Sequence, residues 1–221
     1  MLGAAATLSL APTPSALPAQ SAPSEALAAE LFTGFAWSLR TPLVIELAGE
    51  RRVIRARWST RPFDDAPYYS YRVARASVGR EIAAEMLHHK LYLENPVPPI
   101  DRLEVSHGYN EPMFDLATRG EGFRWRFGIG VVIAHPEGEL AGRSIGPLRT
   151  LLGGGYHVAG ISSQLAVGRR YPLNGGAVAM TASPELKLTA AIARIRIARG
   201  DLLVPNVALH ALGGLGLRRR W

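Results

Sequence analysis

The sequence predicts an all-β fold: an antiparallel, up-and-down transmembrane β-barrel of eight to ten strands. Three observations lead to this prediction. Apolar and polar residues alternate with a period of two along most of the chain, glycine-bearing turns separate the alternating segments, and short and long connections follow one another in turn. A meander barrel in a membrane has these properties, because its strands join through short turns at one end and longer loops at the other.

Residues 123–135 carry the clearest alternation. One parity holds arginine and glycine, and the other holds six large apolar side chains: Phe123, Trp125, Phe127, Ile129, Val131 and Ile133. A lipid-facing strand places aromatic and branched side chains on one face in this way, and its other face lines the barrel interior. We therefore expect the apolar set to face lipid and Arg124 and Arg126 to face inward.

Weaker alternation marks seven further strands: 52–60, 68–77, 80–93, 102–118, 156–171, 177–197 and 202–218. A helical interpretation stays open for 83–93 and 186–197, where alanine and leucine are frequent. Counting back from a last strand that ends in the periplasm, residues 31–47 should contain an even number of crossings, with 31–39 and 42–47 as candidates. This gives ten strands, and eight remain if residues 31–47 do not supply a spanning pair.

The connections fall into two classes. Tight turns are expected at 48–51, 77–79, 119–122 and 173–176, and longer links at 61–67, 94–101, 136–155 and, shortest of these, 199–201. The two classes alternate along the chain, which assigns the turns to one end of the barrel and the links to the other. In an outer membrane, the links would lie outside the cell and the turns in the periplasm.

Composition excludes several classes of function. The chain has 221 residues, a net charge of +7 and no cysteine, which excludes thiol catalysis, disulfides and cysteine-ligated metals. It has no uncharged apolar run of about 18 residues, so no transmembrane helix is expected. Lys90 and Lys187 are the only lysines, and the arginines are dispersed along strands. A nucleic-acid partner is therefore not expected, and neither is a cofactor.

Residues 1–29 have the composition of a signal peptide or a disordered leader. They consist almost entirely of Ala, Leu, Ser, Pro and Thr, with a short apolar stretch at 4–11 and an Ala-x-Ala-like site at 26–28. The basic start typical of signal peptides is missing, since no Lys or Arg precedes Arg40. The barrel domain is expected to occupy residues 30–221.

Over residues 32–221 the chain resembles Gram-negative outer-membrane β-barrel proteins. The resemblance is carried by the alternating strand 123–135, by the segment 87–93 that leads through a proline-rich loop to 105–110, and by the Gly-Leu-Gly ending before the aromatic Trp221. Three arginines, 218–220, stand before Trp221, where this family usually has none. The resemblance implies a bacterial outer-membrane location, outer-membrane lipid and lipopolysaccharide as partners, a monomer, and a structural, binding or narrow-channel role.

Among enzymatic barrels the chain is weakly similar to the lipid A deacylase family, whose serine and histidine occupy neighbouring positions of one strand. Residues 106–110 read Ser-His-Gly-Tyr-Asn, and the family's His-x-Ser-Asn pattern is not present. The similarity implies an alternative function, a lipid A or phospholipid acyl hydrolase.

The pairing of the two strands around this segment decides which residues could meet. If 94–101 closes as a symmetric hairpin loop, paired residue numbers sum to 195, so His88 lies opposite His107 and His89 opposite Ser106. Any odd sum keeps the same two faces.

With an odd sum, the polar lumen face carries Glu81, Glu85 and His89 of one strand and Arg102, Glu104, Ser106, Gly108 and Asn110 of the next. Ser106, His89 and Glu104 could then act as nucleophile, base and orienting acid of an acyl-transfer site.

The interpretation that we favour for the same residues is a packed interior in which charges neutralise one another. Unpaired interior charges are costly, so we expect pairing among Glu81, Glu85, Glu104, Arg124, Arg126, Glu185 and Lys187. Further candidate binding residues are His88, Lys90, His107, Asn110, Arg124 and Arg126. His88 and His107 at the outer rim lack a third ligand, so no metal is expected. His210 shares the parity of Asn206 and should face the lumen.

A soluble lipid-binding barrel of the lipocalin type remains open as a third class. It would show the same period of two, but it would place the aromatic side chains inside the barrel.

Overall fold

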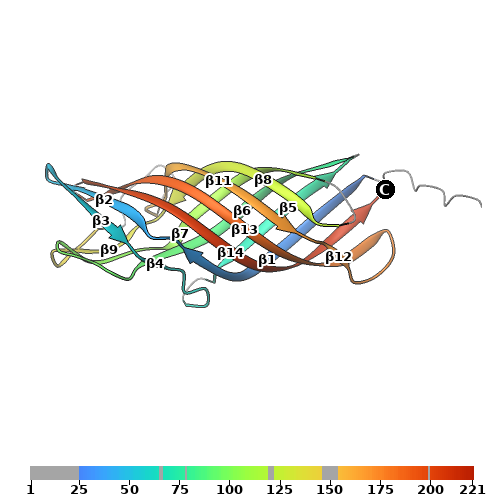
Figure 1. Ribbon diagram of the computed structural model, residues 1–221, viewed down its shortest axis with the longest axis horizontal. Helices are drawn as coiled ribbons and strands as arrows, with labels where there is room; N and C mark the ends of the chain where they lie inside the picture. The colour runs from blue at the N-terminus through green and yellow to red at the C-terminus, as the bar shows by residue number, and fades with distance from the viewer. Residues whose placement is uncertain (1–24, 65–66, 78, 119–121, 146–153, 199) are drawn as a thin grey trace, which may run out of the picture.

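The computed structural model describes residues 25–64, 67–77, 79–118, 122–145, 154–198 and 200–221, and these form a single β-barrel (Figure 1). Its strands are β1 (Ala26–Ser38), β2 (Thr41–Leu47), β3 (Glu50–Ala56), β4 (Trp58–Ser59), β5 (Tyr69–Ala76), β6 (Arg80–Leu93), β7 (Ile100–Thr118), β8 (Arg124–Ala134), β9 (Glu137–Leu140), β10 (Arg143–Ser144), β11 (His157–Gly168), β12 (Tyr171–Pro172), β13 (Val178–Ile197) and β14 (Gly200–Arg220). The described residues contain no helix long and apolar enough to cross a membrane.

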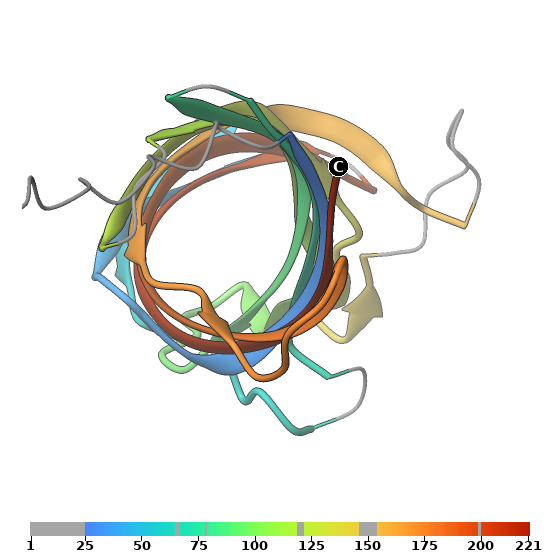
Figure 2. The same cartoon turned by 90° about the vertical axis from the view of Figure 1, so that its right-hand side faces the viewer.

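Eight of these strands close into a ring, in the order β14-β1-β5-β6-β7-β8-β11-β13 and back to β14. Every neighbouring pair is antiparallel, and the eight strands follow one another in chain order, with short strands intervening between β1 and β5, between β8 and β11 and between β11 and β13. The view along the barrel in Figure 2 shows the closed wall. The predicted all-β, up-and-down architecture is therefore confirmed, and the helical interpretation of 83–93 and 186–197 is wrong because both lie in strands β6 and β13.

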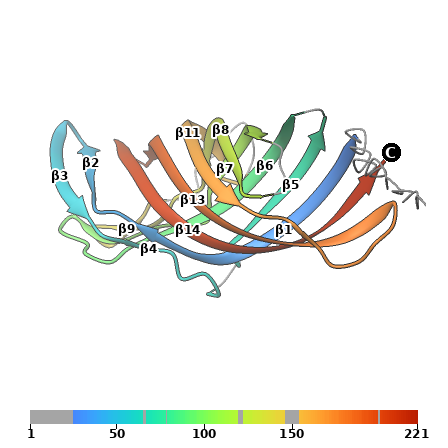
Figure 3. The ribbon, with the colours of Figure 1, turned by 45° about the vertical axis from the view of Figure 1, so that its right-hand side comes forward.

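The ten-strand count is wrong because residues 31–47 make one crossing. β1 and β2 run in the same direction, and both pair with β14, through Ser38 opposite Ala208 and Val44 opposite Leu203. β2 is thus the continuation of β1 after a short break, as Figure 3 shows for the two strands beside β14.

Residues 52–60 and 68–77 also form one crossing and not two. β4 and β5 both pair with β6, through Trp58 opposite Leu93 and Tyr69 opposite His88. The predicted link at 61–67 is therefore an excursion from the wall in the middle of a crossing. Eight crossings result, which was the alternative count.

The two ends of the barrel differ. We call the end that holds Ala26 and Arg220 the terminal end, and the end that holds the β2–β3 turn the loop end; they lie at the right and left of Figure 1. Ala48 and Gly49 make this turn with positive φ angles of 51° and 87°. The tight turn expected at 48–51 is therefore present. It lies at the same end of the barrel as the longer links, and not at the opposite end, because residues 31–47 cross the barrel once.

Part of each expected class of connection lies outside the described residues: 78 and 119–121 of two turns, and 65–66, 146–153 and 199 of three links. The described part of the longest link holds the β9–β10 hairpin, which pairs with the start of β7. Residues 1–24 of the expected leader also lie outside the described residues. Of the rest of the expected leader, Ala26–Ala29 belong to β1 and pair with β14.

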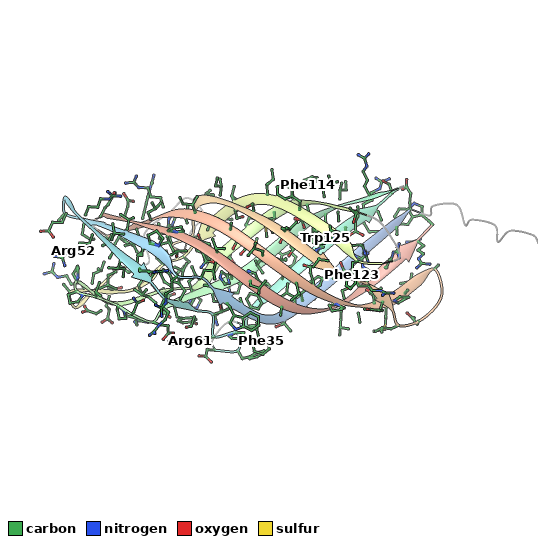
Figure 4. All side chains as sticks on the ribbon, in the orientation of Figure 1. Phe35, Arg52, Arg61, Phe114, Phe123 and Trp125 are labelled. Atoms are coloured by element: carbon green, nitrogen blue, oxygen red, sulfur yellow. The ribbon has the colours of Figure 1, made fainter. Side chains whose placement is uncertain are left out.

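The period of two separates an apolar outer surface from a polar interior. Along residues 123–133 the predicted outward set is exposed except for the half-buried Ile133, with Ile129 at 59%, whereas Arg126 on the other parity is 4% exposed. Phe114, Phe123 and Trp125 lie on the outside of the wall in Figure 4. On β14, His210 and Asn206 are buried inside, as predicted.

The loop end has an apolar core that was not predicted from the sequence. We call this part the head: its interior is filled mainly by buried side chains from β2, β6, β7, β13 and β14, among them Leu43, Ile45, Leu91, Ile195 and Leu202. The outer face of the head carries many charged residues, among them Arg51, Arg55 and Arg194. The head therefore has an apolar interior and a charged outer face, whereas the rest of the barrel has a polar interior and an apolar outer face.

Truncation of the head core should destabilise the fold. We expect Leu91→Ala to lower the free energy of unfolding by about 2–5 kcal/mol, because it removes a fully buried side chain and leaves a cavity. Val53→Ala, on the exposed outer face of β3, should change it by less than about 0.5 kcal/mol. Urea unfolding followed by far-ultraviolet circular dichroism measures both, and equal effects would contradict the assigned core.

Candidate functional site

The interior below the head is a single network of buried ion pairs with Glu85 at its centre. Arg72 donates from Nε to Glu85 Oε2 at 2.9 Å and from a terminal nitrogen to Glu185 Oε1 at 2.7 Å. Lys187 forms a hydrogen-bonded ion pair with Glu85, and Ser70 Oγ donates to Glu85 Oε1 at 2.7 Å. The side chains of Arg72, Glu85 and Lys187 are 2% exposed or less. Such charges are stable inside a barrel only because every one has a counter-charge within contact.

A second part of the network lies nearer the terminal end. Arg170 donates to Glu30 at 2.6 and 2.8 Å and to Glu81 at 3.0 Å, and Arg126 donates to Glu81 at 2.9 Å. Arg72 joins the two parts through its contact of 3.5 Å with Glu30.

Arg124 and Arg126, predicted as inward-facing binding residues, both contact Glu81, at 3.4 and 2.9 Å. The cavity beside Glu30, Arg72 and Arg126 has a volume of about 20 Å³, which is room for one water molecule. The neutralised interior that we favoured is therefore confirmed for Glu81, Glu85, Arg124, Arg126, Glu185 and Lys187.

Glycine makes room for one of the polar contacts in this network. Gln164 donates to Asp115 Oδ1 at 2.6 Å across the lumen face of β8, where Gly128 stands between them. A Cβ at Gly128 would lie 2.0 Å from Asp115 Oδ1. The hydrogen bond therefore requires glycine at this position.

A neutral polar layer separates the ion pairs from the apolar head. Tyr68 and Thr189 hold the ring of His210 between them, with contacts of 2.6 Å to Nδ1 and 2.9 Å to Nε2. His89 is fully buried in the same layer, with its ring centroid 5.1 Å from that of His210.

The predicted register between β6 and β7 is wrong. His89 lies opposite Tyr109 and Leu91 lies opposite Val105. The numbers of paired residues therefore sum to 198 from the start of β6 to His89, and to 196 from Leu91 onward. The sum changes because β7 bulges: it supplies residues 106–108 where β6 supplies Lys90 alone. An even sum reverses the predicted faces of β7, because residues of equal parity now share a face.

The structure consequently does not bring the proposed triad together. His89 lies in the lumen, whereas Glu104 lies on the opposite face of the wall and pairs with Arg102. Ser106 lies in the bulge, with its hydroxyl 3.4 Å from His107 Nδ1. Glu104 was also expected in the interior network and is not part of it, for the same reason.

The remaining predicted binding residues lie on the outer face near the head. His88 Nδ1 is 2.7 Å from Asn110 Oδ1, and its ring stacks on Tyr69 with centroids 4.9 Å apart. Lys90 is fully buried and donates to the carbonyl oxygens of Arg61, at 3.1 Å, and Asp64, which belong to the excursion. These contacts fasten the excursion to the wall.

His107 also lies on this outer face, beside the connection that follows β8. Glu137 Oε1 is 2.9 Å from His107 Nδ1 and 3.2 Å from His135 Nε2. Burial lowers the pKa of His135. Within the described parts of the chain, no three His, Asp or Glu residues are arranged to hold a metal ion.

Sequence reasoning missed several members of the interior network. Arg72 shares its parity with Ser70 and Ala74, and Glu30 shares its parity with Ala28, so the alternation of these two strands could have placed both inside. Arg170 follows the end of β11, and nothing in its sequence context indicates that it folds back into the lumen. Chemically, the arrangement of these side chains is suited to stiffening and filling a barrel.

Loss of the central carboxylate should be costly. We expect Glu85→Gln to lower the free energy of unfolding by about 3–5 kcal/mol, because it leaves Arg72 and Lys187 with fewer counter-charges inside the barrel. Glu46→Gln breaks the exposed contact with Arg194 and should cost less than about 1 kcal/mol. Urea unfolding measures both. Pairing E85Q with Lys187→Met should recover part of the loss, and an unchanged deficit would contradict the assigned coupling.

Comparisons with known proteins give a structural similarity and no sequence relative. No protein-family model matches the chain, and no curated protein matches it. Among solved structures it is similar to the solid-state NMR structure of the outer membrane protein AlkL in DMPC lipid bilayers, with 11% sequence identity and a TM-score of 0.43 over 95% of this chain and 97% of that one.

Proposed function

We propose that the protein is a β-barrel of the bacterial outer membrane with a structural or binding role. The observation that carries this proposal is the closed ring whose outer surface is apolar and whose interior is charged. On β8 the apolar outward row runs from Trp125 to Ile133, preceded by Phe123. Ten residues of a strand tilted by about 40° rise roughly 25 Å, which matches the apolar band of such barrels.

The filled interior favours a binding or structural role over a channel. A solute moving along the axis would have to displace the buried ion pairs around Glu85 and then the apolar core of the head. Lipopolysaccharide and outer-membrane phospholipid are the partners that we propose for the outer surface of a monomer.

The two alternatives are less well supported. A soluble lipid-binding barrel would hold its aromatic side chains inside, whereas Phe127 and Trp125 are more than half exposed on the outside. The predicted hydrolase site would need His89 beside Ser106, whereas His89 lies in the lumen and Ser106 lies in the bulge of β7. Lipid A and phospholipid mass spectra that change with expression of the protein would favour the hydrolase over our proposal.

A charge in the apolar band should disrupt insertion. Ile129→Arg should lower the free energy of unfolding in lipid by about 2–4 kcal/mol, because the guanidinium would face hydrocarbon near the midplane. Val53→Arg is the matched control, since Val53 is equally exposed but lies on the head between Arg51 and Arg55. Heat-modifiable gel migration and urea unfolding in vesicles measure both. If I129R inserts as well as V53R, the membrane assignment is wrong.

The proposed topology places the head outside the cell and the terminal end in the periplasm. The absence of cysteine allows single-cysteine labelling: Arg51→Cys at the loop end should react with an impermeant maleimide on intact cells, and Gly175→Cys should react only after lysis. Both positions are exposed, and a Cβ at Gly175 meets no neighbour within 4 Å. The reverse labelling pattern would invert the topology.

A further inference from the structure

We propose that the outer rim of the terminal end binds the phosphate headgroups of anionic phospholipids. This inference rests on the proposed function, because it requires the apolar outer surface to lie in a membrane. The rim consists of exposed arginines that follow directly on the apolar band: Arg75, Arg80, Arg169, Arg219 and Arg220.

Four strands change from apolar to arginine in a single step on their outward face. The steps are Leu217 to Arg219 on β14, Val73 to Arg75 on β5, Ile82 to Arg80 on β6, and Val167 to Arg169 at the end of β11. Two residues along a strand span about 7 Å, so each guanidinium can reach past the hydrocarbon edge to the depth of lipid phosphates while its stem stays over the band.

Carboxylates are scarce around the rim arginines in the part of the chain that the structure describes. Among the described residues on the outside of this end, Glu25 is the single side-chain carboxylate, and it pairs with Arg75 at 2.9 Å. Arg169 lies over the ring of Tyr171 at 5.0 Å, which orients a guanidinium at the edge of the band without neutralising it.

The outer surface of the head differs, because carboxylates are frequent among its described residues. Arg194 contacts both Glu46 and Asp201, at 2.9 and 3.1 Å, and Arg61 contacts Glu94 at 2.9 Å. The excess positive charge on the outer surface is therefore concentrated at the terminal end. A phosphodiester headgroup supplies the missing negative charge, and arginine binds phosphate oxygens with two parallel hydrogen bonds.

In the proposed topology, the terminal end meets the periplasmic leaflet, so the ligand that we assign is a phospholipid and not lipopolysaccharide. Phosphatidylglycerol has the required single negative phosphodiester. Its binding at the rim would fix the depth and direction of the barrel in the membrane.

The experiment compares the full chain in vesicles of phosphatidylcholine that contain trace spin-labelled phosphatidylglycerol or phosphatidylcholine. We expect the protein to immobilise labelled phosphatidylglycerol more strongly by a factor of about five, and high salt should remove the difference. The triple variant Arg80→Gln, Arg169→Gln, Arg219→Gln should bring the ratio near one. The matched control Arg55→Gln, Arg57→Gln, Arg196→Gln removes the same charge from exposed head positions and should keep the original ratio.

The outcomes separate this inference from the proposed function. A protein that inserts with heat-modifiable migration but immobilises both lipids equally would overturn the lipid site alone. Equal loss of selectivity in both triple variants would overturn the rim site and assign the selectivity to the overall charge of the protein. Stronger immobilisation of labelled lipid A through the rim arginines would overturn the choice of phospholipid as the ligand. A protein that does not insert would contradict the proposed function itself.

Discussion

The closure of the sheet by β1 and β14 is the constraint on which the rest of the structure depends. β1 pairs with β14 from Ala26 to Ser38, and this pairing leaves the eight-stranded ring without a free edge. A closed ring of this size has an interior that side chains must fill, and it gives every strand one inner and one outer face. The chemistry of each residue follows from the face on which closure places it.

Closure also explains why so many charges are stable inside the barrel. The lumen surrounds Arg72 with Glu30, Glu85 and Glu185, so its guanidinium meets three carboxylates from three different strands. Removing any one strand would leave the other charges buried without partners, and that penalty couples the strands into one cooperative unit. The apolar head above this network buries its side chains in the same way as a soluble protein, and it carries its charges outside.

The outer surface and the interior of the barrel therefore each change polarity along the axis. The outer surface passes from arginine at the terminal end, through the apolar band, to a head whose charges are balanced, while the interior passes from ion pairs to the Tyr68–His210–Thr189 layer and then to an apolar core. Neither pattern is what a water-filled pore requires. Both suit a rigid barrel with a filled interior.

The sequence by itself determined the faces of the regular strands. The alternation from Phe123 to Ile133 was enough to place Ile129 outside and Arg126 inside, and the same reasoning placed His210 in the lumen, because an unbroken strand has a strict period of two. Only the tertiary structure decided how β6 and β7 align, since the bulge at 106–108 changes the register without changing the composition of either strand. It also decided that residues 31–47 cross once, because a break at Leu39 and Arg40 interrupts the alternation without reversing the chain. The interior ion pairs join residues as distant as Arg72 and Glu185, which meet only because the ring closes, and closure is a property of pairing between strands and not of any one strand.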